Sequence, residues 1–281
     1  MSSAKAVASI KRLLPKGVKI GHTGTLDPMA SGLLVVLLGR ATRLSRYVTG
    51  LGKSYTATAR LGAVSDTLDA EGKISEVEGG IPTEEKLRAE LPRFRGEIRQ
   101  TPPMASAVKV GGERLYKAHR RGETIEREAR EATVYSFELT EYDPDEPSAS
   151  FEISCGGGTY VRTLVADLVE AAGSGAYLTA LRRTSVGDLR VEDAVLPDLL
   201  SVEELPSRLA AMRGVVSHLP VVEVGSEERR MVGHGKSLSL DERFDEVEDS
   251  PLRVESNGEL LAIYRVKDES ARPEAVLCPA Q

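Results

Sequence analysis

Asp27 has the side chain and the setting for chemistry by a carboxylate. Pro28 follows it, which pushes the backbone of Asp27 into an extended conformation. Gly24 and Gly32 flank it, and glycines let a loop approach a ligand closely. An Asp-Pro pair is also a common way to start a turn. A catalytic reading of Asp27 therefore needs partner residues elsewhere in the chain.

Two residues are candidate partners. Arg162 is expected in the first turn of a helix that opens at Thr159, where the helix dipole disfavours a cation by about 0.3–1 kcal/mol. A guanidinium placed there can bind a carboxylate such as that of Asp27, or a phosphate. The alternative is a solvent-facing arginine whose stem covers the core. Tyr55 is either a core tyrosine of an alternating strand or an aromatic ring that stacks on a base.

Other kinds of site have weak sequence support. Gly156–Gly158 precedes a helix and could form a phosphate nest, but it matches neither dinucleotide nor Walker spacing. Gly50–Ser54 resembles the end of a P-loop whose first glycine is missing. Four histidines and two cysteines lack the spacing of metal ligands: His22, His119, His218, His234, Cys155 and Cys278. We therefore expect no metal and no cofactor.

Charge is distributed unevenly along the chain, whose net charge is −6. Residues 1–60 hold ten Lys or Arg and one acid, Asp27, and residues 88–130 hold eleven basic and six acidic residues. Residues 131–281 hold 14 basic and 29 acidic residues. This asymmetry suggests a nucleic-acid face on part of the protein. No apolar stretch is long enough to cross a membrane, and no signal peptide is apparent, so we expect a cytoplasmic protein.

Hydrophobic periodicity predicts an α+β main domain followed by a small β-rich one. Helices are expected over Ala4–Leu14, Ala41–Leu51, Thr83–Leu91, from Thr159 onward, and over Pro197–Arg213. Strands are expected over Leu33–Leu38, Tyr55–Leu61, Gly96–Gln100, Ser106–Val110, Thr133–Glu141 and Phe151–Cys155. Beyond His218 come short strand-like segments with turns such as Asn257-Gly258. We place the domains at 1–215 and 216–281.

Five stretches together resemble one family. Gly21-His-Thr-Gly-Thr-Leu-Asp-Pro-Met-Ala-Ser-Gly32 closely resembles the signature loop of the TruB family, the bacterial tRNA pseudouridine-55 synthases. The other stretches, in the family's order, are Lys53–Gly62, Asp66–Gly72, Gln100–Lys109 and Cys155–Leu164, and Leu181-Arg182-Arg183 follows. The resemblance covers about residues 2–215. The tail from about Ser217 resembles, more weakly, a PUA RNA-binding domain.

The resemblance implies a role for each matching residue. Asp27 takes the place of the catalytic aspartate, the nucleophile, and Arg162 that of the arginine that pairs with it. Tyr55 matches the tyrosine that stacks on the target base, and Tyr160 and Leu181 match residues of the pocket. His22 matches the histidine that occupies the space of the flipped nucleotides. Lys53, Arg43 and Arg46 are expected to bind RNA from the basic segment.

The activity that the resemblance implies is the isomerisation of the uridine at position 55 in the tRNA T-arm to pseudouridine. It implies a pseudouridine synthase fold with a mixed or antiparallel sheet, tRNA as partner, no required protein partner and a monomer. Three alternatives are a guide-RNA-dependent synthase of the same family, a non-catalytic tRNA-binding or folding protein, and a nucleoside-level glycosidase. The Pro102–Tyr116 run resembles the bacterial enzymes, which favours the stand-alone synthase.

Two departures from the family pattern lead to further expectations. The chain opens directly into the helix at Ala4, whereas the family begins with a strand and a Lys-Pro motif. We expect that missing strand to leave a sheet edge unpaired. The C-terminal domain contains the acidic run Asp241–Asp249, which puts its contribution to RNA binding in doubt.

Overall fold

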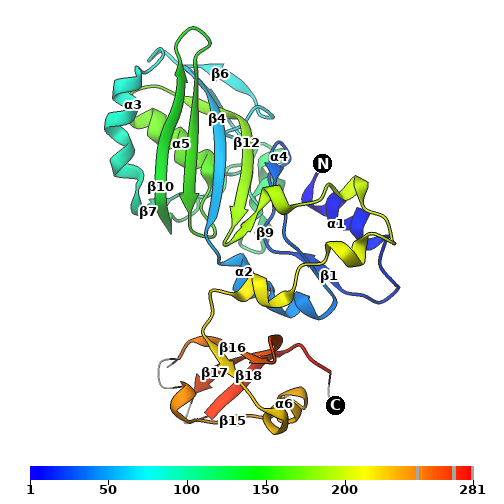
Figure 1. Cartoon of the computed structure of the whole chain (residues 1–281). Helices are drawn as coiled ribbons and strands as arrows, with labels where there is room; N and C mark the ends of the chain where they lie inside the picture. Colours follow the sequence, from blue (N-terminus) through cyan, green and yellow to red (C-terminus); the bar gives the residue numbers. More distant parts are fainter. Residues whose placement is uncertain (245–246, 248, 268–269, 280–281) are drawn as a thin grey trace.

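A computed structural model describes residues 1–244, 247, 249–267 and 270–279. Its main feature is a sheet with the strand order β13-β12-β4-β11-β10-β7, in which β2 also pairs with β12 (Figure 1). All the pairs are antiparallel except β2 with β12, which is parallel, so the expectation of a mixed or antiparallel sheet is confirmed. The strands are β2 (Ser31–Gly32), β4 (Lys53–Leu61), β7 (Gly96–Gln100), β10 (Arg130–Asp143), β11 (Ser148–Cys155), β12 (Ala176–Val186) and β13 (Leu189–Arg190).

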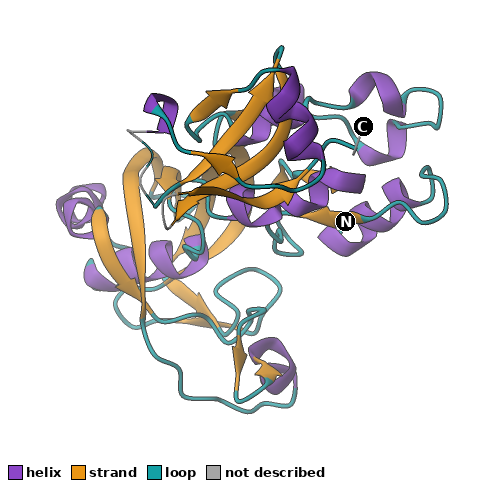
Figure 2. Cartoon of the chain, turned by 90° about the horizontal axis from the view of Figure 1, so that it is seen from below, coloured by secondary structure: helices purple, strands orange, loops and turns teal. Residues whose placement is uncertain are grey.

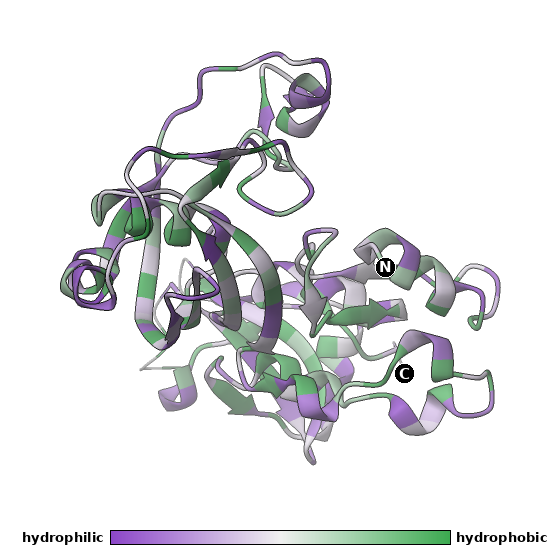
Figure 3. Ribbon diagram, turned by 90° about the horizontal axis from the view of Figure 1, so that it is seen from above, coloured by the Kyte–Doolittle hydropathy of each residue, from purple (hydrophilic) through white to green (hydrophobic). Residues whose placement is uncertain are grey.

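The core of the main domain lies between this sheet and two helices, α3 (Glu84–Glu90) and α5 (Val161–Ala171). Every second residue of the central strand β4 points into it, and Ala57, Ala59 and Leu61 are buried. The strands of the sheet accordingly show bands of alternating hydropathy (Figure 3). The expected helix at Thr83 is confirmed, because the Thr83 side chain accepts a hydrogen bond from the Lys86 amide.

The N-terminal segment forms α1 (Ser3–Lys11), followed by a hairpin of β1 (Ile20–His22) with β3 (Val36–Leu38). Helix α1 is shorter than expected, and the Ser2 side chain caps it. Only the last three residues of the expected strand Leu33–Leu38 belong to β3. The expected helix Ala41–Leu51 is a 3₁₀ turn, η1 (Gly39–Leu44), followed by α2 (Ser45–Thr49).

Two small hairpins branch from the main sheet. One pairs β5 (Ala63–Ser65) with β6 (Ile74–Glu76). The other pairs β8 (Lys109–Val110) with β9 (Glu113–Arg114) and leads into α4 (Leu115–Arg120). This second unit has its own small core around Met104, Leu115 and Ala118.

Two features of residues 172–216 differ from the expectation. Strand β12 was not anticipated, because its charged residues interrupt the alternation of apolar side chains. The expected helix Pro197–Arg213 is wrong: short 3₁₀ turns occupy the stretch that follows β13. A proline at 206 cannot donate a helical hydrogen bond, and Leu196, Leu199 and Leu209 are exposed rather than packed in a stripe. The turns are η3 (Val191–Asp193), η4 (Pro197–Leu199), η5 (Leu205–Arg208) and η6 (Met212–Val216).

The C-terminal part forms a second sheet with the order β14-β16-β17-β18-β15. Figure 2 distinguishes the helices from the strands of both sheets. Asn257 and Gly258 have positive φ angles of 50° and 74°, as the tight turn between β16 and β17 requires. The elements are β14 (Val221–Glu223), α6 (Ser226–Gly233), β15 (Leu238–Ser239), η7 (Glu242–Phe244), β16 (Pro251–Ser256), β17 (Glu259–Lys267) and β18 (Ser270–Val276). Helix α6 was not expected.

The two sheets are joined by a shared apolar cluster. Leu44, Tyr47 and Val48 of the N-terminal part pack in it with Ile263 and Leu277 of the C-terminal part. The expected domain boundary at 215/216 falls inside η6. Part of the acidic run Asp241–Asp249 (245, 246 and 248) lies outside the described residues.

Candidate active site

The carboxylate of Asp27 and the guanidinium of Arg162 form a bidentate ion pair. Arg162 Nε donates to Asp27 Oδ2 at 2.9 Å, and Nη2 donates to Oδ1 at 3.0 Å. The Arg162 side chain is only 4% exposed, whereas that of Asp27 is 34% exposed. The buried arginine therefore orients a carboxylate that solvent or a substrate can still reach. The pairing proposed from the sequence is present in the structure.

All five N–H donors of Arg162 have acceptors. Besides the two bonds to Asp27, Nη1 donates to Thr67 O at 2.6 Å and to Asp69 Oδ2 at 3.1 Å, and Nη2 donates to Ala105 O at 2.9 Å. A buried charge is tolerated only when it is paired and fully hydrogen-bonded. Arg162 meets this condition, so its position and that of Asp27 are tightly fixed.

Asp69 is a site residue that sequence reasoning missed. It is 3% exposed, and its Oδ1 accepts from Thr67 Oγ1 at 2.6 Å and from the Glu71 amide at 3.1 Å. Two carboxylates thus accept hydrogen bonds from the single guanidinium of Arg162. The only signal in the sequence was that Asp69 lies in the Asp66–Gly72 stretch that resembles the family.

The start of the chain helps to hold the loop that carries Asp27. Ser3 is 5% exposed, and its Oγ accepts from the Leu26 amide at 2.9 Å and donates to Leu26 O at 3.3 Å. At the other end of the loop, Gly32 has a φ of +99°, and a Cβ there would lie 2.2 Å from Arg183 O. Only glycine fits this close approach.

Tyr55 and Tyr160 lie close enough to Asp27 for its charge to affect the pKa of both phenols. Burial raises the pKa of both phenols, and the Asp27 carboxylate adds a smaller rise. Tyr55 projects from β4 and packs partly against the main core. Tyr160 immediately precedes α5, where the Gln100 side chain accepts from its amide at 3.0 Å and donates to its carbonyl at 3.2 Å. Both tyrosines thus lie within range of the Asp27 charge, one on β4 and one just before α5.

Leu181 and His22 occupy different surroundings. Leu181 is 6% exposed on β12, where it pairs in register with Ala57. His22 ends β1 at the start of the loop that carries Asp27, and its Nδ1 accepts from the Gly24 amide at 3.4 Å. His22 thus lies at the start of the loop that carries Asp27, and Leu181 lies on the strand next to the one that carries Tyr55.

Lys53 does not extend into solvent, contrary to the expectation that it binds RNA. It is 7% exposed, and its Nζ donates to Thr49 O at 3.0 Å and to Leu51 O at 2.7 Å. Burial, followed by repulsion from Arg183, lowers its pKa. Its ammonium binds the carbonyls at the end of α2, so the assignment to RNA binding is corrected to a structural one.

Arg43 and Arg46 are exposed, but both contact the C-terminal sheet. Arg43 Nη1 donates to Val276 O. Arg46 Nη2 lies 3.3 Å from Glu274 Oε2, and its guanidinium sits 4.8 Å from the centre of the Tyr47 ring. Both arginines thus help to join the two parts of the fold, and their binding to RNA stays a prediction.

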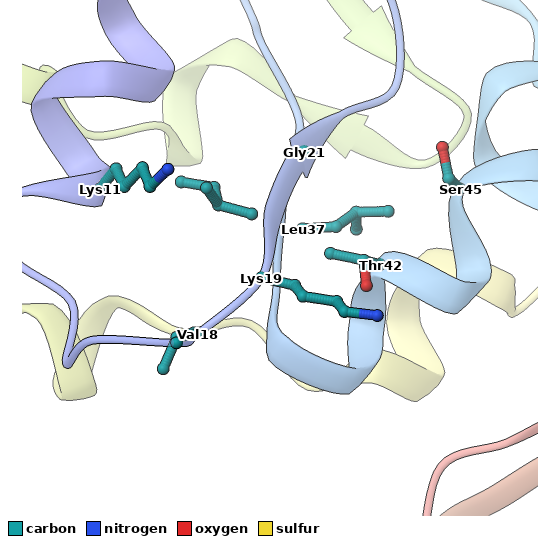
Figure 4. A pocket seen from close by; sticks show the side chains of 9 residues that line it. Lys11, Val18, Lys19, Gly21, Leu37, Thr42 and Ser45 are labelled. Atoms are coloured by element: carbon teal, nitrogen blue, oxygen red, sulfur yellow. The ribbon is translucent and has the colours of Figure 1, made fainter.

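A cavity of about 520 Å³ lies elsewhere, between α1, β1 and η1 (Figure 4). Lys11, Lys19, Leu37, Thr42 and Ser45 contribute to its lining. None of the candidate site residues lines it. Within the described residues, no group of three or more His, Cys, Asp or Glu side chains could hold a metal ion. No helix in the described part of the chain could cross a membrane.

Comparison with known proteins agrees with this geometry. Residues 11–161 match the TruB family pseudouridylate synthase N-terminal domain. The chain is 40% identical to tRNA pseudouridine synthase B of Ralstonia nicotianae, over 98% of this chain and 90% of that protein. It is 41% identical to the protein of the same name from Burkholderia mallei, over 99% and 93%. The chain belongs to the TruB family of pseudouridylate synthases.

Solved structures support the same fold. A chain from the crystal structure of a Cbf5-Nop10-Gar1 complex superposes with a TM-score of 0.74 at 26% identity, covering 100% of this chain and 82% of that one. A chain from an archaeal box H/ACA Nop10-Cbf5 complex gives a TM-score of 0.72 at 25% identity, covering 100% and 84%. These likenesses extend over both sheets of the present structure.

Proposed function

We propose that this chain converts the uridine at position 55 in the T-arm of tRNA to pseudouridine, with Asp27 as the nucleophile. The observation that carries the proposal is the partly exposed Asp27 carboxylate held by the buried Arg162, in a chain of this family. Relatives at about 40% identity are named tRNA pseudouridine synthase B, which supports tRNA as the substrate.

The reaction needs a carboxylate and no added group. The bond between C1′ and N1 of uridine breaks, C1′ bonds to C5, the proton on C5 leaves, and N1 gains a proton. A carboxylate oxygen can begin this sequence by attack at C1′, as in glycoside chemistry, or at C6 of the uracil. Each oxygen of Asp27 accepts one bond from Arg162 and keeps a further lone pair for the substrate.

The target base must leave its stack before Asp27 can reach it, at a cost of a few kcal/mol. We propose that the Tyr55 ring stacks on the flipped base. This stacking would offset about 1–3 kcal/mol of the cost of unstacking. Leu181 and Tyr160 would line the remaining walls, and His22 would fill the space that the flipped nucleotides vacate.

We propose that the enzyme acts alone, as a cytoplasmic monomer, rather than with a guide RNA. The relatives named as tRNA enzymes are about 40% identical, whereas the solved chain from the Cbf5-Nop10-Gar1 complex is 26% identical. A non-catalytic RNA-binding role would not require the fully bonded Arg162 and its paired Asp27. A nucleoside-level enzyme would not require the basic segments.

Release of tritium from an unmodified tRNA transcript labelled at uracil C5 tests this function. The purified chain alone should release one tritium per transcript, before and after treatment with EDTA. A transcript with cytidine at position 55 is the matched control and should release none. Release from the control, dependence on an added guide RNA, or turnover of free uridine would contradict the proposal.

A further inference from the structure

A second buried arginine, Arg183, lies behind the loop that carries Asp27. Its side chain projects from β12, and the residue is 2% exposed. Its Nε donates to Leu33 O at 2.7 Å, and its Nη2 donates to Gly24 O at 3.1 Å. Gly24 and Leu33 bracket Asp27 in the sequence. A single guanidinium therefore holds both ends of the loop.

The backbone of Arg183 holds the same loop. The Leu33 amide donates to Arg183 O at 2.9 Å, and Gly32 is the register partner of Arg183 between β2 and β12. On its other side, Arg183 is the register partner of Tyr55 between β12 and β4. Arg183 thus stands between the strand that carries the stacking ring and the loop that carries the carboxylate.

We propose that Arg183 is a positioning residue for the isomerisation, which sets Asp27 relative to Tyr55 without touching the substrate. This inference rests on the proposed function. Its physical basis is the precision that the reaction demands, because a displacement of about 1 Å at a reacting group can lower a rate about 100-fold. Arg162 can meet both oxygens of Asp27 only while the two ends of the loop are fixed.

The test compares three variants with the parent chain. Arg183→Met keeps the length and the apolar stem but removes the charge and the donors. Arg183→Lys keeps the charge and can replace part of the hydrogen bonding. Arg182→Met, at the exposed neighbouring position, is the matched control. Single-turnover tritium release with saturating tRNA gives the rate of the chemical step, and filter binding gives the Kd for tRNA.

Arg183→Met should lower the single-turnover rate about 100-fold while the Kd for tRNA changes less than about threefold. Arg183→Lys should recover an intermediate rate, and Arg182→Met should match the parent. A rate for Arg183→Met within threefold of the parent, or a loss explained by an equal loss of affinity, would overturn the positioning role. If Arg183→Met does not fold, the single-turnover rate of Arg183→Lys is the deciding measurement. A rate for Arg183→Lys equal to that of the parent would then overturn the proposal. An inactive parent would instead overturn the proposed function, and this inference with it.

Discussion

At the scale of single residues, Arg162 is the point where four segments of the chain meet. Its guanidinium binds the side chains of Asp27 and Asp69 and the carbonyls of Thr67 and Ala105. These acceptors come from the loop after β1, the turn after β5 and the segment that leads into β8. The carboxylate that we assign to catalysis is therefore held by a buried cation whose every donor is already used.

Asp27→Asn tests the nucleophile. The amide cannot attack carbon as a carboxylate does, so turnover in the tritium-release assay should fall below detection. The Kd for tRNA should stay within about tenfold of the parent, because phosphate contacts dominate affinity. Turnover near that of the parent would rule out Asp27 as the nucleophile.

Asp69→Asn tests the second carboxylate on Arg162. One Asp69 oxygen accepts from Thr67 and Glu71 and the other from Arg162, so an amide NH₂ must face a donor at one of these positions. The free energy of unfolding of the variant, measured by urea denaturation, should be lower by about 1–3 kcal/mol. The variant should also turn over more slowly than the parent. Asp66→Asn, half exposed in the same segment, is the matched control. Equal effects at the two positions would argue against a special role for Asp69.

At the scale of elements, helix α5 carries a titratable group whose state affects stability. Burial, with a smaller contribution from Glu170, raises the pKa of Asp167 from 3.8 to about 6. The folded state therefore binds a proton more tightly than the unfolded state does. The stabilisation is fully present below about pH 4 and is lost as the pH rises through 6.

Asp167→Asn mimics the protonated side chain, so the variant should not lose this stabilisation as the pH rises through 6. Its free energy of unfolding relative to the parent should increase between pH 4.5 and pH 7.5, as urea denaturation at both values would measure. Glu170→Gln removes the neighbouring like charge and should reduce the pH dependence in part. The same difference between variant and parent at both pH values would show that the burial of Asp167 has no such effect.

The contact between α2 and β18 depends on Glu274. Its carboxylate accepts from Tyr47 Oη at 2.5 Å and from Arg265 Nε at 2.8 Å, with Arg46 Nη2 at 3.3 Å. Glu274→Ala should lower the free energy of unfolding by about 1–3 kcal/mol, because it leaves these donors unpaired. Glu259→Ala, which removes an exposed pair with Arg229, should cost less than about 1 kcal/mol. Thermal or urea unfolding of both variants would distinguish the two outcomes.

At the scale of the whole molecule, an acidic protein is expected to bind an anionic substrate. The net charge is −6, yet affinity for tRNA should fall steeply with salt, because the basic N-terminal segment supplies a local positive field. Lys16 and Lys19 are exposed in that segment, and within the described part of the chain neither forms an ion pair.

Lys16→Gln with Lys19→Gln should reduce the slope of log K against log salt by up to about two, at roughly 0.9 per lost phosphate contact. Lys236→Gln with Lys267→Gln, exposed in the acidic C-terminal part, is the matched control and should leave the slope unchanged. Filter binding over a range of salt concentrations measures both. A larger change in the control pair would place the RNA on the C-terminal sheet.

The sequence by itself determined the family, the fold class and the pairing of Asp27 with Arg162, because a short run such as Gly21–Gly32 is specific on its own. It also determined β4, β11 and the Asn257-Gly258 turn, whose periodicity and turn chemistry are local. It failed at β12, because the inward Arg183 breaks the apolar alternation, and its guanidinium donates to carbonyls about 150 residues away along the chain.

Only the tertiary structure decided what the cations do. Lys53, Arg43 and Arg46 have the same sequence character as RNA-binding residues, yet one caps α2 and two bind the C-terminal sheet. Asp69 likewise became visible as a partner of Arg162 only in three dimensions. A charged side chain can lie at a surface or satisfy buried groups, and the choice depends on which distant polar groups the fold leaves within hydrogen-bonding reach.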